Sequence, residues 1–347
     1  MTEKVAVIGH QTHLGRRVVG RLEELGLGWC PLTKADRRSE VRTLIVLGDE
    51  RTPEKDFLDV DGTGCEPMDR DELASTIERL GSPGQVVLLS TGMVYGPAAH
   101  EKLPLTEDLV PRPPAGARFA RARLAAERFF GSWCSERSVS LAILRPVLTL
   151  AEDRSEWFRR SLWRVGGFAG RDVPPMQALH LDDLASAVVL AVERRLEGTF
   201  NVAPDGWMSP DALRDVLGGP GRLGLPYRLA EAVVGVTRPL GFWSTPSEVL
   251  RYARADWVLA NDRLRSHGWT PSHSTEEAFA TVISATGMSA RRRQQVALGV
   301  TAAVGVAAAL TVRLLARKAR RSQIEPGSPS SIGANSTVQL SLESRLS

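Results

Sequence analysis

The sequence predicts an α/β fold with a doubly wound parallel sheet, followed by a smaller, irregular C-terminal domain and a C-terminal membrane helix. Three features support this prediction. Short apolar runs typical of buried parallel strands alternate with helical repeats in the first half of the chain. A glycine-containing loop follows the first apolar run. Finally, a long apolar segment lies near the C-terminus.

The predicted elements alternate in the order that βαβ units require. The first strand covers residues 5–8, and the helix that follows it over 16–26 ends at Gly26, a common terminating residue. Three more buried strands are expected, separated by helices that have apolar residues at helical spacing. These strands lie at 43–49, 85–91 and 140–146, and the helices at 70–81, 119–127 and 182–198.

The composition changes after about residue 150, where proline, glycine and tryptophan become more frequent and the predicted helices shorten. We therefore expect a sheet domain over 1–150, to which 181–203 also contributes, and a smaller substrate-type domain over 151–285. The second domain should cover the carboxyl edge of the sheet, where ligands bind in open α/β folds.

The segment 296–316 carries one charge, Arg313, and has the length of a membrane-spanning helix if this side chain reaches the interface. Basic clusters flank it, so we expect a membrane anchor over 286–321. A buried, alanine-rich helix packed on the folded body is the alternative. The serine-rich tail, 322–347, is expected to be disordered. No signal-peptide core precedes the first strand, so we expect a cytoplasmic body.

The composition gives no reason to expect a nucleic acid or a metal as a partner. The net charge is +4, but eight basic residues and no acidic ones lie between Arg291 and Arg321, so the folded body is mildly acidic. The three cysteines are far apart and fit reduced thiols in a cytosolic compartment. His10 and His13 have a spacing that could bind a metal, but no carboxylate or cysteine is close to them in the sequence, so we predict no metal site.

The loop "IGHQTHLG" (8–15) lies between the first strand and the first helix. A dinucleotide site needs glycines here because the backbone must turn tightly and approach a pyrophosphate, which binds the helix N-terminus. Gly9 and Gly15 occupy the outer glycine positions. Thr12 occupies the middle one, with its Cβ where the phosphates would come closest. The loop predicts a Rossmann-like domain that binds a dinucleotide through Gly9, Thr12 and Gly15.

In a dinucleotide fold the second strand would end at about residue 33, and the residues at this position indicate which dinucleotide would bind. No acidic residue is found there to hold the adenosine ribose of NAD; Thr33 and Lys34 take this place, followed by Arg37 and Arg38. Basic residues suit a 2′-phosphate and favour NADP over NAD, while a solvated loop without selectivity fits the same residues. The next strand follows so closely that the strand and helix usual in this region are expected to be missing.

These motifs, in their order, resemble the extended short-chain dehydrogenase/reductase family of the NAD-dependent epimerase/dehydratase type. The resemblance covers residues 4–283. It implies a Rossmann-like fold, NAD or NADP as cofactor and, through a helix pair beside the active site, a homodimer. Besides the glycine loop, the matching motifs are "DVDGT" (59–63), "LLSTGMVYG" (88–96), "LTEDLVP" (105–111), "ILRP" (143–146), "HLDDLA" (180–185) and "GTFNVA" (198–203).

The resemblance also places the catalytic positions. Thr91 corresponds to the Ser or Thr that hydrogen-bonds the substrate oxygen. Counting back from Glu127, Phe119 and Arg123 correspond to the acid/base tyrosine and its lysine. Phenylalanine has no proton to transfer and arginine does not deprotonate, although Arg123 keeps a charge that could reach nicotinamide ribose hydroxyls. The four-residue spacing predicts that Arg123 packs on the Phe119 ring.

No other tyrosine is expected to restore the missing pair. The chain has three tyrosines. Tyr95 belongs to the loop after a strand, and Tyr227 and Tyr252 are expected in the second domain, far from this motif. In "HLDDLA", Asp182 or Asp183 is expected to cap the helix that follows.

Three functions fit the sequence. The first is a membrane-anchored, NAD(P)-binding sensor, scaffold or partner-binding protein without ordinary Tyr/Lys redox catalysis. The second is an active NADP-dependent oxidoreductase, or an epimerase acting on a nucleotide sugar or lipid, in which Thr91 and water transfer the proton to an unidentified small or lipid-like substrate. In the third, Thr12 and the shortened second-strand region abolish nucleotide binding and leave an interaction domain.

Overall fold

The computed structural model describes residues 4–32, 41–48, 77, 83–97, 103–154, 174–209, 211–212, 252, 255 and 257–285. All of them belong to one compact unit, Met1–Val304. The predicted anchor at 296–316 and the tail at 322–347 lie outside the described residues. None of the helices that are described combines the length and the apolar character needed to cross a membrane.

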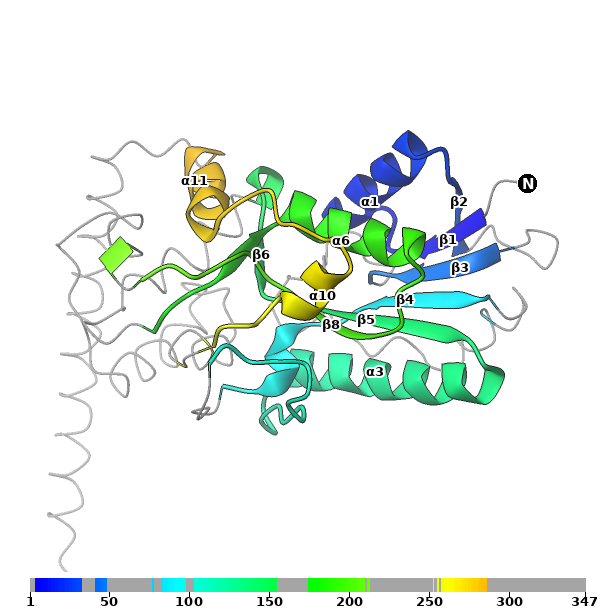
Figure 1. Cartoon of the computed structure of the whole chain (residues 1–347), viewed down its shortest axis with the longest axis horizontal. Coiled ribbons are helices and arrows are strands. Elements are labelled where there is room, and N and C mark those ends of the chain that lie inside the picture. The colour runs from blue at the N-terminus through cyan, green and yellow to red at the C-terminus, as the bar shows by residue number, and fades with distance from the viewer. Residues whose placement is uncertain are drawn as a thin grey trace, which may run out of the picture. The chain divides into compact units, whose positions relative to one another are not determined.

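The centre of the fold is a six-stranded sheet in which every neighbouring pair of strands is parallel (Figure 1). This confirms the predicted Rossmann-like α/β fold. The strand order is β2-β1-β3-β4-β5-β8, so the chain reverses its direction of travel across the sheet after β2. The strands are β1 Lys4–Ile8, β2 Gly28–Pro31, β3 Val41–Val46, β4 Gln85–Leu89, β5 Ser140–Pro146 and β8 Gly198–Val202.

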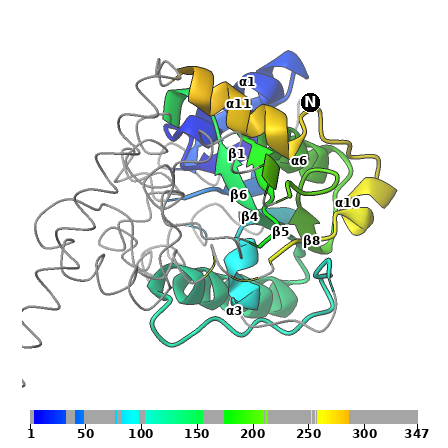
Figure 2. The ribbon, with the colours of Figure 1, turned by 90° about the vertical axis from the view of Figure 1, so that its left-hand side faces the viewer.

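Helices cover both faces of the sheet. Helix α1 (His13–Glu24) and helix α6 (Leu181–Glu193) pack side by side on one face, and α3 (Arg118–Arg137) covers the other (Figures 1 and 2). Because both faces are covered, the strands are almost continuously apolar instead of alternating. Ile77, the one described residue of the helix predicted at 70–81, is buried in the core on the α3 side.

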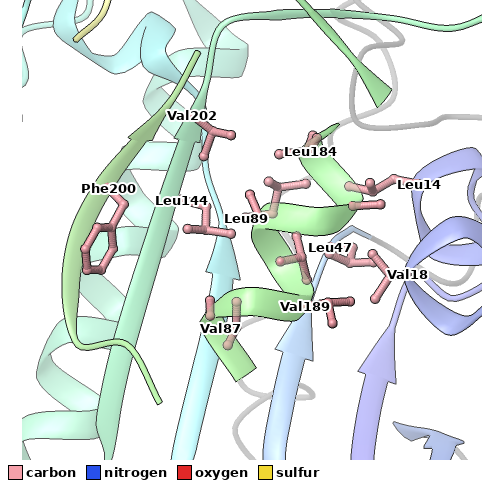
Figure 3. Packing of buried hydrophobic residues seen from close by; sticks show 14 of the residues in the cluster. Leu14, Val18, Leu47, Val87, Leu89, Leu144, Leu184, Val189, Phe200 and Val202 are labelled. Atoms are coloured by element: carbon pink, nitrogen blue, oxygen red, sulfur yellow. The ribbon is translucent and has the colours of Figure 1, made fainter. Parts of the chain in front are cut away.

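The main hydrophobic core lies between the sheet and the layer formed by α1 and α6 (Figure 3). Each helix presents an apolar face at helical spacing, as the sequence predicts. The side chains that meet there include Leu14 and Val18 of α1, Leu184 and Val189 of α6, Val87, Leu89 and Leu144 of the sheet, and Leu47, which directly follows β3.

Among the described strands, the sheet ends at β2 on the side of β1. Only residues 32–40 separate β2 from β3, and β1 lies between these two strands. In the usual six-stranded dinucleotide fold another strand lies outside the second one. Within the described residues β2 is the edge strand on this side.

A smaller layer lies beyond the carboxyl edge of the main sheet. It contains the parallel pair β6 (Leu148–Leu150) and β7 (Ala178–His180), with helix α11 (Thr275–Ala285) packed on it. Phe279 and Val282 of α11 are fully buried against this pair. A short helix, α10 (Asp262–Ser266), packs beside β8.

Candidate functional site

The loop between β1 and α1 has the close backbone packing that requires glycine. Gly9 has a φ of +83°, and a Cβ added there would lie 2.9 Å from the amide nitrogen of Gly48. A Cβ on Gly15 would lie 2.0 Å from the carbonyl oxygen of Gly9. At Gly48, by contrast, an added Cβ would meet nothing within 4 Å. Gly9 and Gly15 are therefore the positions at which this loop requires glycine, as a dinucleotide-binding loop does.

Thr12 stabilises this loop from within. Its hydroxyl donates to the carbonyl of Gly9 at 2.7 Å and accepts from the amide of Gly15 at 2.9 Å, so that it caps α1. The amides of His13 and Leu14, at the first helical positions, cannot find an acceptor within the helix. They are the donors that a pyrophosphate could use. Thr33 and Lys34, predicted to select the dinucleotide, lie outside the described residues.

Charged side chains surround the first turns of α1. Arg17 donates to Asp182 of α6 at 2.7 Å and to Asp153 at 2.8 Å. His13 Nδ1 lies 2.7 Å from the same oxygen of Asp153. Burial opposes the ionisation of Asp153, but hydrogen bonds from Arg17 and His13 outweigh it and hold its pKa below the usual value. This carboxyl group is therefore ionised near neutral pH.

The predicted catalytic positions meet at the carboxyl end of β4. Thr91 is buried and begins the short helix η3 (Gly92–Tyr95), where its hydroxyl accepts from the amide of Met93 at 3.2 Å. Phe119 is buried in the main core, and the Arg123 guanidinium lies 5.5 Å from the centre of its ring, which confirms the predicted contact. Arg123 also donates to the carbonyl of Leu89, the last residue of β4, at 3.4 Å.

Tyr252 was expected to lie far from the Phe119–Arg123 pair, and the structure places it against the short helix that follows Thr91. Its hydroxyl donates to the carbonyl of Met93 at 2.6 Å, and the residue is buried. Met93 therefore binds two hydroxyl groups, that of Tyr252 through its carbonyl and that of Thr91 through its amide. These bonds and the backbone dimensions keep the two hydroxyl oxygens within about 10 Å of each other.

The local sequence contains no signal for this approach. It arises because the segment that carries Trp257 and Leu259 packs tightly on η3. A Cβ added to Gly92 would meet Leu259 at 2.5 Å and Trp257 at 3.0 Å. The rings of Tyr252 and Trp257 are also in edge contact, with centroids 5.8 Å apart. Tyr227 lies outside the described residues.

A buried polar network connects the end of β4, next to Thr91, with β5 and β8. Glu127 of α3 and Arg145 of β5 form a bidentate ion pair with distances of 2.6 and 3.0 Å, and the hydroxyl of Ser90 also contacts this carboxylate. Arg145 donates to the Tyr95 hydroxyl, which in turn donates to Asn201 of β8 at 2.8 Å. Burial raises the pKa of Tyr95, and Arg145 offsets this only in part. Tyr95 is thus a structural residue, held as a neutral donor.

The "HLDDLA" motif is organised differently from the prediction, because neither aspartate caps α6. His180 is the cap, and its Nδ1 accepts from the amide of Asp182 at 3.3 Å. Asp183 is buried and instead accepts from the amides of Ser272 and His273 in the segment before α11. His180, which caps α6, also contacts His273 directly. Their rings are stacked with centroids 4.0 Å apart.

We expect the stability of the protein to fall as pH is lowered below about 6.5 because of His180. Burial, followed by repulsion from His273, lowers the pKa of His180, so the unfolded chain takes up this proton at a higher pH than the folded one. Denaturant unfolding at several pH values should show a smaller loss of stability in His180→Asn, which keeps a cap acceptor. Equal pH dependence in both proteins would contradict this assignment.

Sequence comparison finds distant relatives only. No protein-family model matches the chain. Two uncharacterized proteins from strains of Mycobacterium tuberculosis and one from Mycobacterium bovis are each 26% identical over 224 residues, which is 63% of this chain. The chain spans 58% of the length of these curated relatives.

Solved structures match the fold over most of the chain. RMD from Pseudomonas aeruginosa complexed with NADPH has a TM-score of 0.56 at 17% identity, covering 82% of this chain and 97% of that chain. The UDP-glucose 4-epimerase from Thermus thermophilus, in complex with NAD, has a TM-score of 0.56 at 17% identity, covering 82% and 100%. That from Thermotoga maritima, with UDP-glucose, has a TM-score of 0.55 at 15% identity, covering 82% and 98%. The chain shares the fold of these proteins.

Proposed function

We propose that the chain is an atypical relative of the extended short-chain dehydrogenase/reductases that binds NAD(P) without ordinary Tyr/Lys redox catalysis. It would act as a sensor, scaffold or partner-binding protein. The observation that carries this proposal is the pair Phe119 and Arg123, stacked on each other beside the end of β4. A phenyl ring there cannot transfer a proton, and the guanidinium beside it does not deprotonate.

The glycine loop supports dinucleotide binding in this proposal. Gly9 and Gly15 allow the backbone to approach a ligand, and the amides of His13 and Leu14 would bind its pyrophosphate. A bound nicotinamide dinucleotide supplies hydride chemistry, and the protein holds and orients it. Arg123 would hold the nicotinamide ribose.

Other parts of the proposal come from the sequence. Thr33 and Lys34 favour NADP, the segment 296–316 would anchor the chain to a membrane with its body in the cytoplasm, and the chain would form a homodimer.

The position of Tyr252 favours a second candidate, an active oxidoreductase or epimerase acting on a nucleotide sugar or lipid. In that case Thr91 would bind the substrate oxygen, with water or Tyr252 as the proton source. The Tyr252 hydroxyl binds the same residue as Thr91, and the two hydroxyl oxygens lie within about 10 Å of each other.

Titration with NADPH and NADH, followed by a turnover assay with UDP-glucose, separates these candidates. We expect the parent protein to quench and shift NADPH fluorescence but to show no turnover. The double change Phe119→Tyr with Arg123→Lys should bind equally well, and any activity should be confined to it. Turnover by the parent that is lost in both Thr91→Val and Tyr252→Phe would establish the second candidate. If the protein binds neither dinucleotide, the remaining hypothesis is an interaction domain without nucleotide binding.

A further inference from the structure

The first turn of α1 carries an exposed cation, Arg16, that no carboxylate contacts among the described residues. Its guanidinium folds back over the glycine loop and donates to the carbonyl of Gln11 at 2.6 Å. It also lies 3.0 Å from His13 Nδ1. Arg16 thus holds a positive charge directly beside the loop.

The same turn also carries a negative charge. Asp153, from the short helix η4 (Glu152–Arg154) after β6, contacts His13 and Arg17, the first and fifth residues of α1. Its side chain is 34% exposed, so it is only partly screened by water. Arg17 does not cancel this charge, because Asp182 already pairs with the same guanidinium from the other side. Glu152 also lies 4.0 Å from the same guanidinium, so the group formed by Arg17 and these carboxylates keeps a net negative charge.

Nδ1 of His13 binds Asp153 if it carries a proton and Arg16 if it does not. One nitrogen cannot donate to Asp153 and accept from Arg16 at the same time. The distance to Asp153 is 2.7 Å, against 3.0 Å to Arg16, and the carboxylate is ionised. The donor form, which binds Asp153, is therefore favoured and holds this carboxylate at the helix N-terminus.

We propose that Asp153 acts as an internal anion that opposes the phosphates of a dinucleotide at α1, while Arg16 attracts them. The inference rests on the proposed function, in which the pyrophosphate binds at this helix end. The positive end of the helix dipole acts only within the first turn, so a carboxylate and a phosphate placed there compete for the same field and repel each other. Asp153 thereby lowers the affinity for the dinucleotide, and Arg16 raises it.

Three single substitutions test the proposal, with NADPH fluorescence titration as the readout. At low salt, Asp153→Asn should bind NADPH about threefold to tenfold more tightly than the parent protein, and Arg16→Gln should bind it more weakly by a similar factor. The matched control is Asp182→Asn. It removes an equal charge from the same Arg17, but Arg21 donates to the backbone carbonyl of Asp182, so this residue lies one turn further along α1. Its effect should stay within about twofold.

The salt dependence and the fold provide further checks. The differences should shrink at about 0.5 M salt, because screening then acts over a few ångströms. Thermal unfolding should show that all three variants fold. A folded Asp153→Asn protein that binds NADPH as the parent does, or more weakly, would overturn the inference. Binding by Asp153→Asn alone, with none by the parent, would support it strongly. Binding by no variant would reject the dinucleotide site itself, and the inference with it.

Discussion

The substitution Gly15→Ala is expected to lower the free energy of unfolding by about 3 kcal/mol or more, and to abolish NADPH binding. The added Cβ would lie 2.0 Å from the carbonyl oxygen of Gly9 and 2.6 Å from the backbone of His10. These are main-chain atoms of a tight loop, so they cannot rotate away as a flexible side chain would. The start of α1 must therefore separate from the loop. Denaturant unfolding and NADPH titration measure the two effects.

Helix α1 offers its own matched control, Gly20→Ala. A Cβ at Gly20 would meet nothing within 4 Å, and alanine is more favourable than glycine in a helix interior by about 1 kcal/mol. This variant should therefore be slightly more stable than the parent and bind NADPH unchanged. Similar losses in Gly15→Ala and Gly20→Ala would show that helix propensity, and not close backbone approach, governs this region.

The change Glu127→Gln should cost about 3–5 kcal/mol of stability, because it leaves the Arg145 charge buried without a counter-charge. Both side chains of this ion pair are at most 7% exposed. The amide has nearly the same shape as the carboxylate, so the loss reports the charge and its hydrogen bonds with little contribution from a cavity. Denaturant unfolding is the measurement.

The control for this change is Asp108→Asn, the same chemical substitution in an exposed ion pair. Asp108 is 81% exposed and lies 2.9 Å from Arg263, so its loss should cost less than about 1 kcal/mol. Comparable costs at the two positions would mean that the Glu127–Arg145 pair adds no more than a surface pair. A large cost at Glu127 alone would establish that the network holds the ends of β4 and β5 around Thr91.

Much of the fold could be predicted from the sequence, since apolar runs mark buried strands. The strand predicted at 140–146 has those bounds in the structure. The predicted ends of helices and strands differ from the structure where a side chain caps the element. Helix α1 begins at His13, earlier than predicted, because Thr12 caps it. The strand predicted at 85–91 ends at Leu89, because Thr91 caps the short helix that follows.

The candidate site was less predictable, because its geometry depends on contacts between residues far apart in the sequence. The Phe119–Arg123 contact could be predicted because the two residues are one helical turn apart. The approach of Tyr252 to Met93 spans 159 positions in the chain, and no local pattern marks it. For the same reason, the cap at His180 could not be assigned, since the choice depends on the distant segment that engages Asp183.

The double role of Met93 has a mechanical consequence. Its peptide groups connect the Tyr252 side chain to Thr91, which lies two residues beyond the end of β4. A ligand that displaces Tyr252 would free the Met93 carbonyl, reorient this turn and weaken the hold on the Thr91 hydroxyl. Binding next to Tyr252 would then change the hydrogen bond of Thr91 through the peptide groups of Met93.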